Sequence, residues 1–335
     1  MKKHIIEIAV LVAALAMCAC LLSCGRNDQK PASQPEKVTI AYSAATDAVL
    51  AEIAQRQGYY LQEGLEAKPI MRAYGKAALQ AVLDGEADFA TVADPPVMFA
   101  IMRGEKISVI ATIQTNTNGN AIVARKDRGI ISPKDLKGRK IGVTPGTTGD
   151  FFMDIFLSLN GISRKDVKVV SLSPDKLPGA LVNGDVDAVS TFTIYLIQSQ
   201  MKLGEKGITF YDENIYTFTF NIVATQEFIR NNPEKVKKLL RALIKAEELV
   251  KLNPDGAQKI IAAYSGLDIA MVRRLWTDTS HRVALDQKLI LALEDESHWA
   301  IKNKLTKATK IPNYLDYIYF DGLKSVKPEA VRILR

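Results

Sequence analysis

Residues 81–90 (AVLDGEADFA) and residues 180–189 (ALVNGDVDAV) repeat one pattern roughly a hundred positions apart in the chain. Each stretch is typical of the end of a helix, a glycine that follows it and a new strand. Glycine is favoured after a helix because the left-handed backbone conformation costs it little. The aspartate before each short apolar run suits the turn that opens a strand. The pattern therefore predicts the same helix-to-strand transition twice.

The similarity extends to both sides of these two stretches. The matching pairs are 37–42 (KVTIAY) with 140–144 (KIGVT), 57–58 (QG) with 160–161 (NG), and 104–106 with 204–206 (both GEK). One chain thus contains two copies of a strand-helix-strand-helix-strand unit. Such a repeat predicts an α/β fold with two similar lobes that face each other.

The composition is that of a globular protein. Of the 335 residues, 47% are hydrophobic and 24% are charged, which lets the chain bury two ordinary cores. The formal net charge of +7 is spread widely along the sequence. A nucleic-acid-binding protein would show a basic stripe with exposed aromatic residues or a recognisable module, and neither is found. We therefore expect no nucleic-acid partner, and basic faces that are solvated near an anionic membrane surface.

The first 25 residues have the order of a secretory signal. Lys2 and Lys3 precede an apolar run over 8–22, which is short for a membrane span of about 20 residues. Residues 21–24 (LLSC) resemble the lipobox of bacterial lipoproteins, and this resemblance implies cleavage before Cys24 and a lipid on its sulfur. The alternatives are an uncleaved anchor or a plain signal with incidental cysteines.

The lipobox resemblance implies a signal peptide over 1–23 and a flexible tether over 24–36. We therefore expect a lipoprotein anchored at the cell membrane, on its periplasmic or extracellular face. Cys18 and Cys20 would be removed with the signal. The mature chain would then have no thiol free for a disulfide, a metal site or nucleophilic catalysis.

Apolar spacing gives the two lobes the same order of elements. For lobe 1 (37–120) we predict strands at 38–42, 65–71, 88–92 and 107–113, and helices at 47–61, 75–83 and 95–102. For lobe 2 (121–220) we predict strands at 140–143, 167–172, 187–191 and 208–211, and helices at 150–159, 175–182 and 194–202. Two crossover strands, within 116–125 and 216–224, join the lobes. Residues 221–335 should return to lobe 1 and end in a helical segment that packs on it.

The loops at the carboxyl ends of the strands should line a cleft between the lobes. In lobe 2 the loop 144–150 (TPGTTGD) lies between the first strand and its helix. Gly146 lets the backbone turn freely, Thr147 and Thr148 offer hydroxyls, and the helix N-terminus offers free N–H groups, which suits an anionic or polar group. The same residues can also serve only as a helix cap. The loop lacks the patterns of nucleotide-binding loops.

Lobe 1 has small and polar residues at the matching places. Its first loop is 43–47 (SAATD), in which Asp47 either contacts a ligand or starts the helix. Asp94 follows the third strand, where it could accept a hydrogen bond from a ligand or cap the next helix. Tyrosines at strand ends, including Tyr195, could form aromatic walls or simply pack. The candidate ligand-binding residues are Ser43, Ala44, Thr46, Tyr74, Asp94, Gly146, Thr147, Thr148, Thr191, Phe192 and Tyr216.

Catalytic patterns are scarce in this sequence. His281 and His298 are the only histidines after the signal segment, and they lack metal-ligand spacing. No nucleophile elbow and no paired carboxylate motif is present. The sequence therefore predicts no metal, no cofactor and no enzymatic activity.

Together these features resemble the solute-binding proteins of ABC importers, and in particular the SsuA/THI5-like (NMT1-like) group. The resemblance is carried by 37–42, 58–65, 83–89, 135–143 and the loop 146–150. It implies a periplasmic binding protein type II fold, a monomer, and a small polar or anionic solute such as a sulfonate, nitrate, taurine or a pyrimidine. It also implies an ABC permease and ATPase as partners.

Two other functions remain open for this group. Some THI5-like proteins are pyrimidine-forming enzymes that use histidine and cysteine chemistry in the cleft, and the candidate loops here carry neither residue. A sensory surface lipoprotein with the same fold is the other alternative.

Overall fold

The computed structural model describes residues 34–43 and 46–334. The expected signal peptide, the lipidation site Cys24 and most of the tether lie outside these residues, as does Ala44. No helix within the described ranges is long and apolar enough to cross a membrane.

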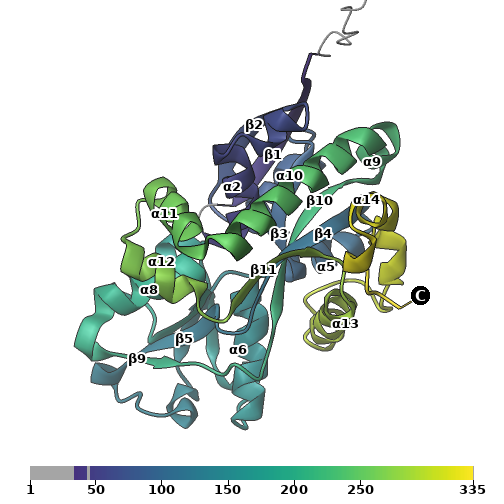
Figure 1. The fold of residues 1–335 in the computed structure, drawn as a ribbon. Coiled ribbons are helices and arrows are strands. Elements are labelled where there is room, and N and C mark those ends of the chain that lie inside the picture. The colour runs from purple at the N-terminus through teal and green to yellow at the C-terminus, as the bar shows by residue number, and fades with distance from the viewer. Residues whose placement is uncertain (1–33, 44–45, 335) are drawn as a thin grey trace, which may run out of the picture. The chain divides into compact units, whose positions relative to one another are not determined.

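The first lobe is built on a six-stranded mixed sheet in the order β11-β4-β10-β3-β1-β2 (Figure 1). Its strands are β1 (Glu36–Ser43), β2 (Leu65–Arg72), β3 (Phe89–Ala93), β4 (Ile107–Asn116), β10 (Phe218–Thr225) and β11 (Thr279–Ala284). Strands β1, β2 and β3 run parallel, while β10 is antiparallel to β3 and β4. The parallel part therefore directs the carboxyl ends of three strands to one edge.

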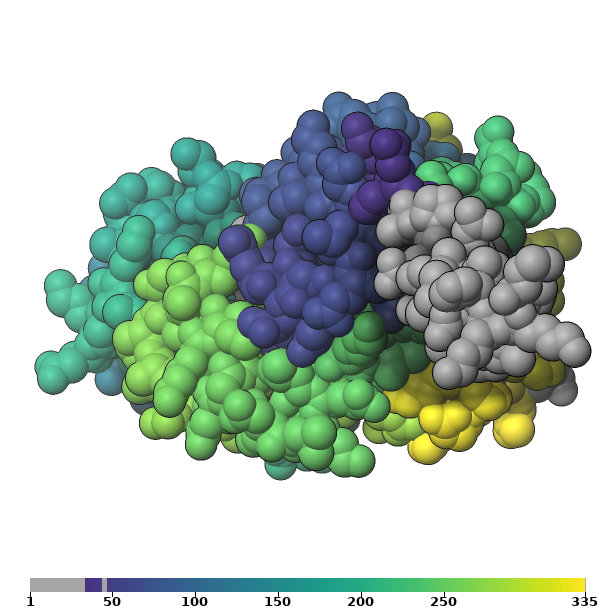
Figure 2. Space-filling model, turned by 45° about the horizontal axis from the view of Figure 1, so that its top comes forward, coloured from purple at the N-terminus to yellow at the C-terminus, as the bar shows by residue number. Residues whose placement is uncertain are grey.

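The helices of the first lobe come from both ends of the chain. The early ones are η1 (Thr46–Ala48), α2 (Val49–Arg56), α3 (Tyr59–Gln62), α4 (Gly75–Leu83) and α5 (Asp94–Met102). The late ones are α9 (Gln226–Asn231), α10 (Pro233–Leu252), α11 (Pro254–Ser265), α12 (Ile269–Trp276), α13 (Gln287–Lys302), η7 (Tyr314–Tyr317), α14 (Phe320–Val326) and η8 (Pro328–Ala330). Figure 2 shows the light-green segment that contains α11 and α12 beside the blue segment of the first lobe. One apolar core unites these early and late elements, since α10 buries Val236, Leu239 and Leu243 against it.

The second lobe is built on a five-stranded sheet in the order β7-β6-β8-β5-β9. Its strands are β5 (Asn120–Arg125), β6 (Lys140–Val143), β7 (Lys168–Ser171), β8 (Ala188–Phe192) and β9 (Gly207–Phe210). Its helices are α6 (Thr148–Leu159), α7 (Leu177–Asn183) and α8 (Thr193–Leu203), with the short helices η2 (Lys126–Arg128), η3 (Pro133–Leu136), η4 (Arg164–Asp166), η5 (Pro174–Lys176) and η6 (Gly204–Lys206). Separate apolar cores lie around Phe156 and around Leu181.

Two connections join the lobes, as the sequence predicts. The chain leaves the first sheet at the end of β4 and enters the second at β5, and it returns between β9 and β10. The predicted α/β fold with two similar lobes is thus confirmed. All of β10 belongs to the first sheet, so that sheet resumes at Phe218.

Two predicted elements differ from the observed ones. The helix expected over 47–61 is interrupted at Gly58, whose φ of 68° is left-handed. The tail also contributes a strand, β11, which pairs with β4 and forms an edge of the sheet. Its polar sequence TSHRVA does not alternate cleanly, because most of this strand is only partly buried.

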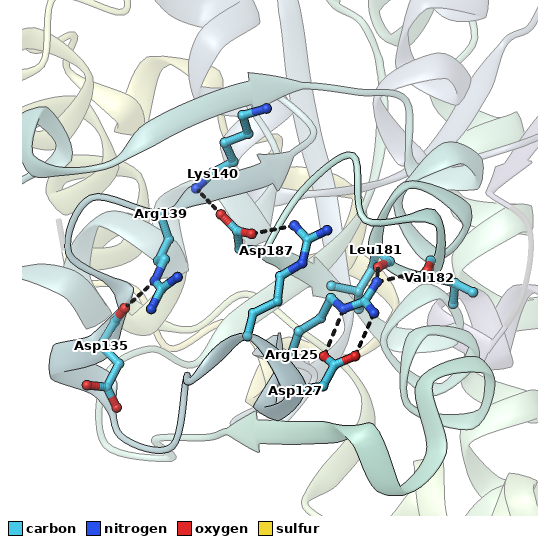
Figure 3. Close-up of polar contacts among 9 residues, drawn as sticks. Arg125, Asp127, Asp135, Arg139, Lys140, Leu181, Val182 and Asp187 are labelled. Atoms are coloured by element: carbon cyan, nitrogen blue, oxygen red, sulfur yellow. Dashed lines mark hydrogen bonds and ion pairs between the residues drawn. The ribbon is translucent and has the colours of Figure 1, made fainter.

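The repeated stretches form the same structure in both lobes. Gly85 and Gly184 have φ angles of 75° and 83°, which place each of them in the left-handed conformation after its helix. The Asp88 carboxylate accepts a hydrogen bond from the backbone N–H of Thr39 in β1, at 2.7 Å. Asp187 accepts one from Lys140 in β6, at 2.9 Å (Figure 3). In each lobe the repeat therefore ties the third strand to the first.

The second lobe reinforces its copy of the repeat with arginines. Arg125 donates to the carbonyls of Leu181 and Val182 at the end of α7, at 3.0 and 2.9 Å (Figure 3). Arg128 forms an ion pair of 2.6 Å with Asp187. Helix-terminal carbonyls are otherwise left without donors, so these contacts stabilise the transition.

Candidate functional site

A small pocket, here called the inner pocket, lies where the carboxyl ends of parallel strands from both sheets face each other. It is lined by Ser43, Asp47, Ala73, Tyr74, Gly75, Lys76, Ala93, Pro96, Thr147, Thr148, Phe192, Thr193, Ile194, Tyr195, Phe218 and Phe220. Its volume is about 30 Å³, which is room for one or two water molecules. The lobes are therefore closed on each other, and a solute would enter only when they part.

Five of the candidate residues meet in the inner pocket: Ser43, Tyr74, Thr147, Thr148 and Phe192. They come from both lobes and occupy the loops or strand ends where the sequence placed them. Thr46 begins η1 next to the pocket, but its side chain lies outside the described part of the structure.

Four other candidates lie elsewhere. Gly146 lines a neighbouring cavity of about 220 Å³. Thr191 is fully buried within β8. Asp94 and Tyr216 contact each other beneath the pocket rather than lining it. Asp94 turns inward because it also accepts a hydrogen bond from the backbone N–H of Thr219, at 2.9 Å.

Three helices begin at the inner pocket and direct their N-termini toward it. Helix α4 begins at Gly75, α6 at Thr148 and α8 at Thr193, and each of these residues lines the pocket. The first N–H groups of a helix lack partners within the helix and carry partial positive charge. Gly75 lets the first turn of α4 lie close against β3, since a Cβ on this residue would lie 3.1 Å from the Cα of Val92. The pocket is therefore suited to an anionic or strongly polar group.

The Ser43 hydroxyl is a second, independent sign of a ligand. The residue is only 2% exposed, and its Oγ has no hydrogen-bond partner in the described structure. Its backbone N–H, by contrast, donates to Thr91 Oγ1 at 3.0 Å. A buried hydroxyl without a partner is unfavourable, so a bound group that pairs with it would gain affinity.

Direct hydrogen bonds cross from one lobe to the other around the pocket. They run from Thr193 Oγ1 to Asp47 Oδ2 (3.1 Å), from the Tyr195 hydroxyl to the Ala73 carbonyl (3.0 Å) and from Lys76 Nζ to the Pro145 carbonyl (3.1 Å). Burial lowers the pKa of Lys76, and the charge of Arg103 lowers it further. These contacts exist only when the lobes are closed, so they favour the closed form.

Asp47 and Thr193 form one of these contacts between the lobes, and the backbone of Thr193 is strained. Burial raises the pKa of Asp47 to about 7, although the hydrogen bond from Thr193 opposes this shift. Thr193 has a φ of 40°, which is rare for a β-branched residue. Its backbone is held there by a 2.9 Å hydrogen bond from its N–H to the Gly119 carbonyl. Strained residues of this kind cluster at functional sites.

Beneath the pocket, Tyr216 lies between two buried carboxyl groups. Its hydroxyl is 2.5 Å from Asp94 Oδ1 and 2.7 Å from Glu296 Oε1. A phenol has one proton, so it donates to one carboxylate and accepts from the other group, which keeps a proton. Burial raises the pKa of Asp94 to about 7. Burial and the nearby charge of Asp94 hold the pKa of Glu296 well above its ordinary value.

An aromatic cluster connects this network to the second lobe. Phe151 of α6 packs edge-on against Tyr216 and Trp299, with ring centroids 4.8 and 5.2 Å apart. The indole N–H of Trp299 donates to Asp154 Oδ2, also on α6, at 2.7 Å. Asp154 and Asp150 in turn share Arg164, each at 2.8 Å. Helix α13 of the first lobe is thereby joined to helix α6 of the second.

Sequence reasoning missed the pocket residue Lys76. Lys76 directly follows Tyr74-Gly75 in the first turn of α4, a position that could have signalled it. Asp47, which the sequence left between ligand contact and the start of a helix, lines the pocket. Tyr195, which it left between an aromatic wall and packing, lines it as well. Among the described residues no cluster of histidine, cysteine and acidic side chains could hold a metal ion.

Comparison with known proteins places this arrangement in a family. The family model "NMT1/THI5 like" matches residues 46–257. The chain is 28% identical over 284 residues to a Bacillus subtilis protein named "Putative aliphatic sulfonates-binding protein", which covers 83% of each chain. It is 26% identical over 235 residues to the Escherichia coli taurine-binding periplasmic protein, which covers 67% of this chain and 69% of that one.

A solved structure shows the same fold. The alkanesulfonate-binding protein SsuA from Xanthomonas axonopodis pv. citri, bound to MOPS, matches with a TM-score of 0.72 and 19% identity, over 86% of this chain and 99% of that one. All three proteins are named as binding proteins. The extent of the family match shows that this chain belongs to the NMT1/THI5-like family.

Proposed function

We propose that this chain is the solute-binding protein of an ABC importer and that it holds a small polar or anionic solute between its lobes. The observation that carries the proposal is the inner pocket, where helix N-termini from both lobes surround the unpartnered hydroxyl of Ser43. A solute bound there would contact both lobes at once and would stabilise the closed form. The names of the sulfonate- and taurine-binding relatives support this class of ligand.

The ligand-binding residues that we propose are Ser43, Tyr74, Thr147, Thr148 and Phe192, together with Asp47, Lys76, Thr193 and Tyr195. The role of the hydroxyls is to donate to the solute, while Lys76 supplies positive charge. Asp94 and Tyr216 would not contact the solute. They would hold the second connection between the lobes in place beneath the pocket.

A thermal-shift panel tests the proposal. The purified chain is mixed with sulfonates, nitrate, amino acids and pyrimidines, and a ligand that binds the folded form raises the melting temperature. Ser43→Ala should weaken the best ligand by about three- to tenfold, because one hydrogen bond is lost. Ser158→Ala, at an exposed position on α6, is the matched control. A panel in which no solute stabilises the chain would refute the function.

The location of the protein is part of the same proposal. A lipid on Cys24 and a tether over 24–36 would keep the lobes close to a membrane-embedded permease and its ATPase. Metabolic labelling with a fatty acid should mark the native chain and leave Cys24→Ser unmarked. Labelling of both chains, or of neither, would refute the lipid anchor and leave solute binding unaffected.

A further inference from the structure

Two buried carboxyl groups share one phenol at the second connection between the lobes. Asp94 and Glu296 are both fully buried, and the Tyr216 hydroxyl lies 2.5 Å from Asp94 Oδ1 and 2.7 Å from Glu296 Oε1. The first carboxyl comes from α5, the second from α13, and the tyrosine from the segment between β9 and β10. These three side chains are here called the carboxyl cluster.

The hydrogen bonds of the carboxyl cluster need one proton more than the phenol supplies. Asp94 accepts from the Tyr216 hydroxyl, from the backbone N–H of Thr219 at 2.9 Å and from the Thr219 hydroxyl at 3.3 Å, as an ionised carboxylate does. These bonds use the single proton of Tyr216, so its contact with Glu296 is a hydrogen bond only if Glu296 donates. Glu296 therefore holds a proton on Oε1, and its Oε2 has no partner in the described structure.

The second lobe completes the enclosure of the carboxyl cluster. Phe151 of α6 packs edge-on against the Tyr216 ring, with centroids 4.8 Å apart, and it belongs to the apolar core of the first lobe. It also packs against Trp299, which lies one turn after Glu296 on α13 and donates to Asp154 of α6 at 2.7 Å. Because α6 moves with the second lobe, parting of the lobes would withdraw the Phe151 ring and let water reach the carboxyls.

The surrounding elements supply no cation that neutralises the carboxyl cluster. The other charged or titratable groups nearest to it are Asp150 and Asp154 of α6, Arg164 of η4, Glu294 and Asp295 of α13 and Tyr314 of η7. Arg164 is shared by the two aspartates of α6, each at 2.8 Å. Burial, then the charge of Asp94 and then that of Asp295 raise the pKa of Glu296. The surroundings therefore favour the protonated carboxyl.

We propose that closure of the lobes is linked to uptake of a proton, which Glu296 holds in the closed form and releases when the lobes part. In the closed form, ionisation of Glu296 would place a second negative charge beside Asp94 in a buried cluster, which is unfavourable. In the open form, water solvates both carboxylates. The closed form is therefore favoured at low pH. It loses this advantage as pH rises through the raised pKa values of the pair, about 7 for Asp94 and well above the ordinary value for Glu296.

Distances between the lobes test this inference on the full chain without a solute. Spin labels are attached through Lys68→Cys on β2 and Lys168→Cys on β7, both at exposed positions, in a chain whose Cys18, Cys20 and Cys24 are replaced by serine. Pulsed electron spin resonance then gives the ratio of closed to open chains between pH 5.5 and pH 8.5. For one linked proton this ratio should fall about three- to tenfold per pH unit near pH 7.

Three variants assign the proton to a residue. Glu296→Gln keeps a hydrogen-bond donor but does not ionise, so most of the pH dependence should be lost. His298→Gln, which removes an exposed titratable group on the same helix, is the control and should keep it in full. Asp47→Asn removes a second carboxyl whose pKa burial raises to about 7, and at least a threefold change per pH unit should remain.

The outcomes separate this inference from its alternatives. A native ratio that does not change with pH, or a dependence that Glu296→Gln retains in full, would overturn it. A dependence that disappears in Asp47→Asn would belong to the inner pocket and would overturn it as well. If Glu296→Gln does not fold, infrared spectra of the native chain decide: the band of protonated carboxyl groups should weaken together with the closed form, and an unchanged band would contradict the inference. Since no solute is present, these results are independent of the proposed function.

Discussion

Asp187 accepts a hydrogen bond from the backbone N–H of Lys140 at 2.9 Å, and Asp88 does the same for Thr39 at 2.7 Å in the other lobe. Each carboxylate joins the start of a third strand to a first strand, at the middle of β1 in one lobe and at the start of β6 in the other. The pairing is continued by the backbone, since the N–H groups of Asp88 and Asp187 donate to the carbonyls of Thr39 and Lys140. Each repeat is therefore a structural clamp, remote from the inner pocket.

Replacing these aspartates should lower stability without affecting solute affinity. Asp88→Ala should reduce the free energy of unfolding by about 1–2 kcal/mol, because the Thr39 N–H loses its side-chain acceptor. Asp187→Ala should reduce it more, since Arg128 also loses its partner at 2.6 Å. Urea unfolding measures both changes. Asp84→Ala, at an exposed position beside the same turn, is the control, and a loss in Asp187→Ala no larger than in this control would contradict the clamp.

Removing one bond between the lobes should weaken ligand binding and leave folding intact. In Tyr195→Phe the hydroxyl that donates to the Ala73 carbonyl across the cleft is lost. The closed form should be disfavoured, and affinity for the best ligand should fall about three- to tenfold. Calorimetric titration gives the affinity. Tyr264→Phe, whose hydroxyl contacts Met71 within the first lobe, should bind like the native chain, and equal loss in both variants would argue against closure.

The buried pair around Tyr216 should make stability depend on pH. The pKa of Asp94 is raised to about 7 and that of Glu296 is raised well above its ordinary value, both mainly by burial, so the folded state holds protons that the unfolded state releases. Their contribution is complete below about pH 4, where the unfolded carboxyls are also protonated, and it declines as pH rises through 7. The free energy of unfolding should therefore fall between pH 5 and pH 8.

Glu296→Gln isolates this effect. An amide keeps a donor for the Tyr216 oxygen but does not ionise, so the variant should lose less stability over the same pH range. Asp47, with a pKa of about 7, contributes in both proteins and cancels in the comparison. Urea unfolding at pH 5, 6, 7 and 8 provides the two profiles. Parallel profiles would show that the pair does not hold a proton.

Two glycine substitutions should act in opposite directions. A Cβ on Gly149 would lie 3.1 Å from the Ser190 carbonyl oxygen and 3.2 Å from the Thr191 Cα, both backbone atoms of β8. Gly149→Ala should therefore cost about 1–3 kcal/mol and displace Thr148 in the pocket. Gly179→Ala, in α7 with open space around it, should instead stabilise by about 0.5–1 kcal/mol. Thermal unfolding distinguishes the two, and similar shifts would contradict the packing of α6 on β8.

Local sequence signals predicted most of the fold because they recur in both lobes. The glycine at position 85 and its counterpart at 184 mark equivalent turns, and periodic apolar residues locate the strands between them. Strand β11 escaped detection, since a short edge strand with serine, histidine and arginine has no clear alternation. What identifies it as a strand is its pairing with β4.

The candidate site was predictable only where one loop determines it. Ser43, Thr147 and Thr148 follow from strand ends and helix starts. The inward turn of Asp94 depends on Tyr216 and on Glu296, which lies about two hundred positions away, and no local pattern announces such a partner. Likewise, Thr193 gains its role only through the approach of Asp47 from the opposite lobe.

The register of the first sheet places Asn116, the last residue of β4, opposite Phe218, the first residue of β10. The second lobe is therefore an insertion between β4 and β10, which would otherwise form an ordinary antiparallel hairpin. A short turn from Asn116 to Phe218 would preserve every strand pairing of the six-stranded sheet. A different unit joined at the same two residues would have to replace the contacts that Phe151 and Asp154 of α6 make with Trp299.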